Sequence, residues 1–124
     1  MQDLSFGSGI PRGILLNPEV EAYLARICPD SPRVMAEMEA TALALGIPVV
    51  GPQVGRFLWQ LACLKGARTA FDMGSGLGCS AAWLALAVGE GGHVVYTDTS
   101  PENCERARGF LGRMRLNDRV EYHV

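Results

Sequence analysis

Three closely spaced glycines and two acidic residues carry the clearest chemical signal in this sequence. Gly74, Gly76 and Gly78 follow shortly after Asp72, and Asp98 lies at the end of the next apolar run. Glycines let the backbone turn sharply and approach a ligand closely, because no Cβ stands in the way. A carboxylate at the end of the neighbouring strand can accept hydrogen bonds from both hydroxyls of a ribose.

The spacing of these residues separates two classes of nucleotide ligand. Dinucleotide-binding turns have the pattern G-x-G-x-x-G, whereas this chain has G-x-G-x-G. Asp72 would repel the pyrophosphate of a nicotinamide or flavin cofactor. S-adenosylmethionine has no phosphate and carries a cationic amine and a sulfonium, so an acid at position 72 suits it better. The alternatives without a ligand are that Asp72 is an ordinary acidic residue of a loop and that Asp98 only ends a strand and begins a turn.

The elements around this turn predict an α/β fold. Strands are expected at residues 69–73, 93–97 and 119–124, and helices at 79–88 and 101–115. Ser100 or Thr99 can cap the second of these helices. Strand–helix–strand–helix–strand implies a parallel sheet of order 3-2-1 with right-handed crossovers. The first strand is central in a complete doubly wound domain, so we expect the N-terminal half of a Rossmann-like domain.

The N-terminal part of the chain predicts helices. Residues 1–16 contain several glycines and little periodicity, which predicts a flexible arm. Helices are expected over residues 17–27, 31–45 and 53–65, and Gly46 is placed to end the second. These helices form the N-terminal part, residues 17–65, of one partial domain that spans residues 17–124.

Apolar residues at three- and four-residue steps predict the buried helix faces. The second helix is expected to bury Met35, Met38, Ala42 and Leu45, and the third Val54, Phe57, Leu58, Leu61 and Ala62. Trp59 and Trp83 are most simply core residues.

Composition narrows the classes of function. The 124 residues have a net charge of -2 and are 48% hydrophobic, which fits one modest domain without a basic surface for nucleic acid. No apolar run approaches the ~18 residues of a membrane span, and the N-terminus lacks a signal pattern, so a cytoplasmic location is expected. Cys28, Cys63, Cys79 and Cys104 are too widely spaced for a zinc or disulfide framework, and we expect reduced thiols packed as small apolar residues.

Four segments together resemble the S-adenosylmethionine-dependent O-methyltransferases of the catechol and caffeoyl-CoA type, in particular their bacterial members. The segments are IPVVGPQVGRFL at 47–58, FDMGSGLGCS at 71–80, VVYTD at 94–98 and NDRVE at 117–121. The glycine turn is shared by many methyltransferases. The V-x-P-x-x-G-x-F-L pattern from Val50 to Leu58 is more specific, and the resemblance spans roughly residues 17–124.

The resemblance implies that four residues surround the methionine part of the cofactor. Val50 would line that end of the pocket, and Asp72 would anchor the amine through water or backbone. Ser80 would hydrogen-bond the carboxylate of the cofactor. Cys79 stands where the family usually has an aromatic residue, so the methionine tail would pack differently here.

The resemblance also implies roles on the nucleoside side. Gly74, Ser75 and Gly76 would let the backbone approach the cofactor. Asp98 would hold the ribose hydroxyls, and Thr99 would lie beside the adenine.

Family members continue beyond the third strand, and the missing part would hold the adenine-contacting loop, acidic metal ligands and a catalytic lysine. We therefore expect a chain truncated after that strand, assign no catalytic or metal-binding residue, and expect a divalent cation (Mg²⁺ or Ca²⁺) only in a full-length form. The resemblance implies a catechol-like or other small hydroxylated acceptor. The uncovered first strand predicts self-association, as a homodimer or larger. A non-catalytic methyltransferase-like binding or dimerisation module is the alternative, and a nicotinamide-dependent oxidoreductase is a weaker one.

Overall fold

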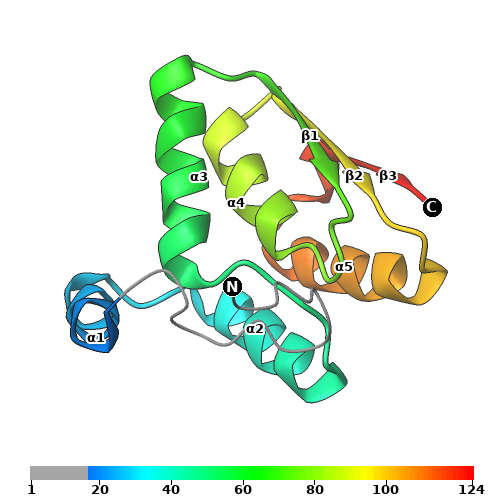
Figure 1. The fold of residues 1–124 in the computed structure, drawn as a ribbon. Helices are drawn as coiled ribbons and strands as arrows, with labels where there is room; N and C mark the ends of the chain where they lie inside the picture. The colour runs from blue at the N-terminus through cyan, green and yellow to red at the C-terminus, as the bar shows by residue number, and fades with distance from the viewer. Residues whose placement is uncertain (1–16) are drawn as a thin grey trace, which may run out of the picture. The chain divides into compact units, whose positions relative to one another are not determined.

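The computed structural model describes residues 17–124 (Figure 1). The arm predicted for residues 1–16 lies outside the described residues. The elements are, in order, α1 (Pro18–Ile27), α2 (Arg33–Leu45), α3 (Pro52–Lys65), β1 (Thr69–Met73), α4 (Cys79–Val88), β2 (His93–Thr97), α5 (Pro101–Arg113), a 3₁₀ turn (Asn117–Arg119) and β3 (Val120–His123). Contacts divide the chain into two units, one ending at Asp30 and one spanning Ser31–Val124.

Helix α1 belongs to the first unit and is amphipathic. The Asn17 carboxamide caps it by accepting a hydrogen bond from the Glu19 amide at 2.8 Å, and a proline in the first turn costs no hydrogen bond there. Its apolar residues Val20, Tyr23 and Ile27 are exposed. The predicted start and end of this helix are confirmed.

The second unit is built on a parallel three-stranded sheet. The strand order is β1-β2-β3, as predicted, and the register places Phe71 of β1 opposite Val95 and Tyr96 of β2 opposite Tyr122 of β3. Helices α4 and α5, which connect the strands, lie on the same side of the sheet (Figure 1). The carboxyl ends of the three strands therefore meet at one edge, beside the loop that leads into α4.

The hydrophobic core lies between one face of this sheet and the helices. Val94 and Tyr96 of β2 point into it and have no exposed surface. Around them pack α4, which is buried on most of its surface, and residues of α2 and α5. Met35, Met38 and Ala42 of α2 are buried as predicted. Leu45 is exposed, contrary to the prediction, because it lies in the last turn, beside Gly46 at the surface.

Helix α3 packs through a different face from the one that apolar spacing predicts. Its buried residue is Gly55, whose Cα lies so close to Trp83 of α4 that a Cβ would stand 2.1 Å from the indole nitrogen. The buried face predicted for α3 is therefore largely wrong: Val54, Phe57 and Leu61 are exposed, and only Leu58 and Ala62 are half-buried. Trp83 is a core residue as predicted, but Trp59 is 39% exposed.

The cysteines are free thiols in two environments. Cys79 and Cys104 are buried, as predicted, whereas Cys63 on α3 is exposed and Cys28 is half-buried. The prediction that Cys63 is buried is therefore wrong. Cys63 is exposed for the same reason as its apolar neighbours on α3, because this helix packs through the face that carries Gly55. None of the helices described over residues 17–124 combines the length and the apolar character that a membrane crossing requires.

Candidate functional site

The loop between β1 and α4 is a turn that three glycines make possible. Gly74, Gly76 and Gly78 all have positive φ, at 71°, 53° and 86°. A residue with a Cβ is destabilised by about 1–2 kcal/mol in this left-handed region. The turn needs this conformation at every second position, which explains the spacing G-x-G-x-G. Gly78 also lies against α5, where a Cβ would be 3.0 Å from a methyl group of Leu111.

The end of β2 fastens this turn through hydrogen bonds. The amide of Ser75 donates to the carbonyl of Thr97 at 2.7 Å. The amide of Gly76 donates to Asp98 Oδ2 at 2.8 Å, and the hydroxyl of Tyr96 donates to the carbonyl of Gly76 at 2.6 Å. Three consecutive residues of β2 and the following loop therefore hold the turn in one conformation.

Asp72 links the end of β1 to the start of α4. Its carbonyl accepts hydrogen bonds from Ser75 Oγ at 3.0 Å and Thr97 Oγ1 at 2.9 Å. Its carboxylate accepts the hydroxyl proton of Ser80 at 2.8 Å. The half-buried Asp72 thus brings a negative charge next to the first turn of α4, where the helix dipole favours an anion.

Asp98 is an anchor for three donors. Besides Gly76, its carboxylate accepts the Ser100 amide at 2.8 Å and the Asn103 side-chain amide at 3.4 Å. A carboxylate offers about four lone-pair positions, so it retains capacity for a ligand hydroxyl. Thr99, next to it, is exposed.

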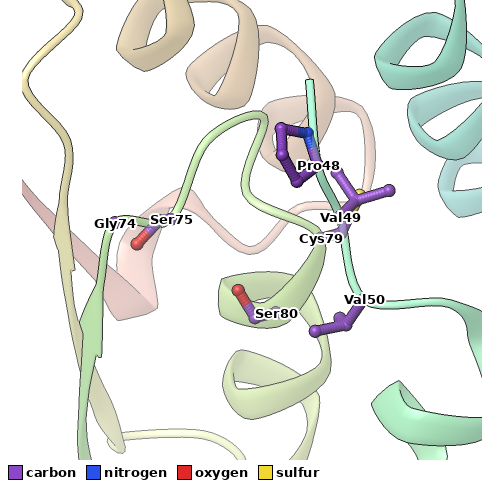
Figure 2. A pocket seen from close by; sticks show the side chains of 7 residues that line it. All are labelled: Pro48, Val49, Val50, Gly74, Ser75, Cys79 and Ser80. Carbon is purple, nitrogen blue, oxygen red and sulfur yellow. The ribbon is translucent and has the colours of Figure 1, made fainter. Parts of the chain in front are cut away.

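A pocket of about 280 Å³ opens beside the turn (Figure 2). Its lining comes from the segment before α3, from the glycine turn and from the start of α4: Pro48, Val49, Val50, Gly74, Ser75, Cys79 and Ser80. Figure 2 shows the apolar side chains of Pro48 and Val50 across from Gly74 and Ser75, which follow the end of β1. One wall is apolar and the other offers hydroxyl and backbone groups.

The structure brings most of the predicted site residues together. Val50, Gly74, Ser75 and Ser80 line the pocket. Asp72, Gly76 and Asp98 do not line it and instead join its walls through the hydrogen bonds described above. Thr99 also lies outside the lining.

Sequence reasoning assigned no role to several residues of this site. Pro48 and Val49 line the pocket, and their signal was available, since both belong to the segment on which the family resemblance rested. The hydroxyl of Tyr96 donates a hydrogen bond to the turn, and the side-chain amide of Asn103 donates one to Asp98. No sequence signal distinguishes Tyr96 from any other aromatic residue of a buried strand.

The described lining of the pocket is uncharged, and the carboxylate of Asp72 lies behind it, hydrogen-bonded to Ser80. Among residues 17–124, none of the lining side chains is cationic. Burial, with a smaller contribution from the negative charge of Glu39, raises the pKa of the Cys79 thiol from 9.0 to about 12, so this thiol stays protonated and is a poor nucleophile. Over the same residues, no three histidine, cysteine or acidic side chains are grouped to hold a metal ion.

Comparison with known proteins supplies the identity. A family model described as O-methyltransferase matches residues 26–124, which include the pocket and the glycine turn. The chain belongs to this O-methyltransferase family. The resemblance read from the sequence and the expected half of a methyltransferase fold are both confirmed.

Three relatives show how far the similarity of this chain to other members of the family extends. The chain is 37% identical to a catechol O-methyltransferase of Mycobacterium tuberculosis over 86% of its own length and 50% of the relative's. A methyltransferase structure from Geobacter sulfurreducens has a TM-score of 0.83 at 38% identity, covering 88% of this chain and 57% of that one. An O-methyltransferase from Bacillus cereus, solved in complex with SAH (S-adenosylhomocysteine), has a TM-score of 0.76 at 32% identity, covering 85% and 49%. The chain thus spans about half the length of the curated relatives it matches.

Proposed function

We propose that this chain binds S-adenosylmethionine beside the glycine turn and forms the donor-binding half of an O-methyltransferase. The observation that supports this most strongly is the pocket, which has an apolar wall, a hydroxyl-bearing wall and a carboxylate behind it, with no cationic side chain lining it among residues 17–124. These features suit a ligand with a cationic amine and no phosphate. The SAH complex of the Bacillus cereus relative supports the same ligand class.

The methionine part of the ligand would lie between Val50 and the start of α4. Ser80 has one hydroxyl proton, and that proton goes to Asp72. Its lone pairs are therefore free to accept from the ligand's amine, while donation to the ligand's carboxylate requires the hydroxyl to turn away from Asp72. Cys79 leaves this part of the wall small and uncharged.

The nucleoside part would lie along the turn toward the end of β2. Gly74, Ser75 and Gly76 present backbone without bulky side chains on this path. Asp98 would accept a hydrogen bond from one ribose hydroxyl at its remaining lone-pair position, and from the second by displacing the Asn103 side-chain amide, which donates at 3.4 Å. Thr99, exposed beyond Asp98, is where we place the adenine.

The bound donor would supply an electrophilic methyl group on a sulfonium, and an acceptor oxygen would displace it in line. The residues of this chain would contribute orientation: they would hold the donor so that its methyl group faces the acceptor. We propose a small hydroxylated acceptor such as a catechol. No residue here is assigned to acceptor activation or to a divalent cation.

Calorimetry with two ligands tests the proposal. We expect S-adenosylhomocysteine to bind and NADH not to bind. Asp72→Asn should weaken S-adenosylhomocysteine binding about tenfold, as expected for loss of a charge-assisted contact. Asp118→Asn, at an exposed position of the 3₁₀ turn, is the matched control and should change little.

Two results would contradict this function. Tight binding of NADH alone would point to an oxidoreductase. Binding of neither ligand would leave the alternative of a non-catalytic association module.

We also propose that the chain self-associates through the face of β1 that none of the helices in the Ser31–Val124 unit covers. Phe71 and Met73 on this face are 62% and 80% exposed, and β1 is an edge strand of the described sheet. Exposed apolar side chains beside an open strand edge favour association. Sedimentation velocity should show dimers or larger species that Phe71→Ser weakens, whereas Leu43→Ser, at an exposed position of α2, should have no effect. A wild-type monomer at all concentrations would rule this out.

A further inference from the structure

The buried hydroxyl of Tyr96 contacts the glycine turn. Tyr96 lies on the helix-covered face of β2 and has no exposed surface. Its hydroxyl donates to the carbonyl oxygen of Gly76 at 2.6 Å. A buried tyrosine hydroxyl requires a hydrogen-bond partner, and here that partner belongs to the loop beside the pocket rather than to the core.

Gly76 is thereby held at both polar groups of its backbone. Its carbonyl oxygen accepts a hydrogen bond from the hydroxyl of Tyr96. Its amide donates a hydrogen bond to the carboxylate of Asp98, which lies two residues after Tyr96 in the chain. Because Gly76 has a φ of 53° and glycine samples many other conformations at little cost, these two bonds select one of them.

We propose that Tyr96 is a positioning residue for the donor site: its hydroxyl, through the Gly76 carbonyl, holds the turn and Asp98 in the geometry that binds the nucleoside. This inference rests on the proposed function of the same site. The Gly76 carbonyl and the Gly76 amide belong to two successive peptide units, which the φ and ψ angles of Gly76 link. Without the hydroxyl, the unit that carries the carbonyl loses its restraint and these two angles can change. The Gly76 amide can then leave Asp98, and ligand binding has to restore the conformation.

The hydroxyl remains a donor at all ordinary pH values. Burial, followed by the negative charge of Asp98, raises the pKa of Tyr96 well above its usual value of 10.0. The effect of Tyr96 on ligand binding should therefore be independent of pH.

Tyr122 on β3 provides a matched control. It pairs with Tyr96 in the sheet register, and the two ring centroids are 5.2 Å apart. Its hydroxyl donates to Asn117 Oδ1 at 2.5 Å, and this bond lies outside the glycine turn. Tyr96→Phe and Tyr122→Phe remove the same atom from two neighbouring rings, and only the first touches the donor site.

The test compares the affinity of wild type and both variants for S-adenosylhomocysteine by calorimetry, with thermal melting to monitor folding. We expect Tyr96→Phe to weaken binding roughly tenfold, in line with one lost hydrogen bond that leaves a buried acceptor unpaired. Tyr122→Phe should stay within about twofold of wild type, since it removes no bond of the turn. Equal affinity of folded Tyr96→Phe and wild type, or equal losses in both variants, would overturn the proposal.

Amide hydrogen exchange at Gly76 decides the remaining cases. If no form binds S-adenosylhomocysteine, the proposed function fails, and Tyr96 is then judged by whether Tyr96→Phe speeds exchange of the Gly76 amide while Tyr122→Phe does not. If Tyr96→Phe does not fold, the wild-type chain is measured: exchange at Gly76 as slow as in β2 supports the restraint, and exchange as fast as in an open loop refutes it.

Discussion

The two faces of the sheet differ sharply, although the same three strands form both. On the face that α4 and α5 cover, Val94 and Tyr96 are fully buried. On the opposite face, Phe71 and Met73 of β1 are mostly exposed. Parallel strands are normally buried on both faces. The side chains of the open face are thus of the type that a second layer would cover.

This difference indicates that the proposed donor site depends on the covered face of the sheet. The glycine turn, the pocket and the fastening residues Tyr96, Thr97 and Asp98 all lie where β1 and β2 meet the covered side. The hydrogen bonds described above for the turn are made within residues 72–98. The turn and the pocket can therefore form while the sheet still has an open apolar face.

The largest effect is expected where the covered side is packed most closely. Gly55→Ala places a Cβ 2.1 Å from Trp83 Nε1, and because the indole is buried, it has to displace its neighbours to move away. Such overpacking should lower the free energy of unfolding by about 3 kcal/mol, as measured by urea denaturation.

Gly109→Ala is the control for this variant. Gly109 is an exposed position of α5, and its Cβ would meet nothing within 4 Å. Alanine there should stabilise the chain by roughly 0.5–1 kcal/mol, because it restricts the unfolded chain and favours the helix. If both variants had equal stability, the close contact between α3 and α4 would be refuted.

A smaller effect should separate the two faces within one strand. Val94 is buried under the helices, and its neighbour Val95 points to the open face and is half-buried. Val94→Ala should cost about 2 kcal/mol of unfolding free energy, since it leaves a cavity in the core, and Val95→Ala less than about 1 kcal/mol. Equal losses in urea denaturation would mean that the open face is covered in solution.

The effect that is smallest near neutral pH appears only at alkaline pH. The Cys79 pKa is about 12 in the folded chain against an ordinary 9.0, so between these values only the unfolded form loses the proton. Stability is then present below pH 9.0 and falls as pH rises toward 12, by at most about 1.4 kcal/mol per pH unit. Cys79→Ala should flatten this part of the curve of unfolding free energy against pH, whereas substitution of the exposed Cys63 by alanine should not.

The sequence was informative where local chemistry decides structure. Asn17-Pro18 and Ser100-Pro101 mark helix starts, and Gly46 and Gly66 adopt the left-handed conformation that ends α2 and α3. Capping depends on a few neighbouring residues, so these boundaries could be predicted closely. The glycine spacing likewise predicted a turn, because only glycine adopts the required φ cheaply.

Tertiary packing decided the rest. Apolar spacing on α3 indicated Val54, Phe57 and Leu61 as its buried face, but the helix approaches α4 through Gly55, which has no hydrophobic side chain to signal a contact. The bond between Tyr96 and Gly76 depends on how far the end of β2 reaches past the turn. That distance follows from the sheet register, which sequence does not provide.

One measurement tests the central claim directly: the amide spectrum of the isotope-labelled chain during titration with S-adenosylhomocysteine. The account predicts saturable shifts at Gly74, Ser75 and Ser80, which line the pocket, and none at Leu43 or Gly109. Unchanged amides at the first three positions under saturating ligand, or shifts confined to other parts of the chain, would contradict it.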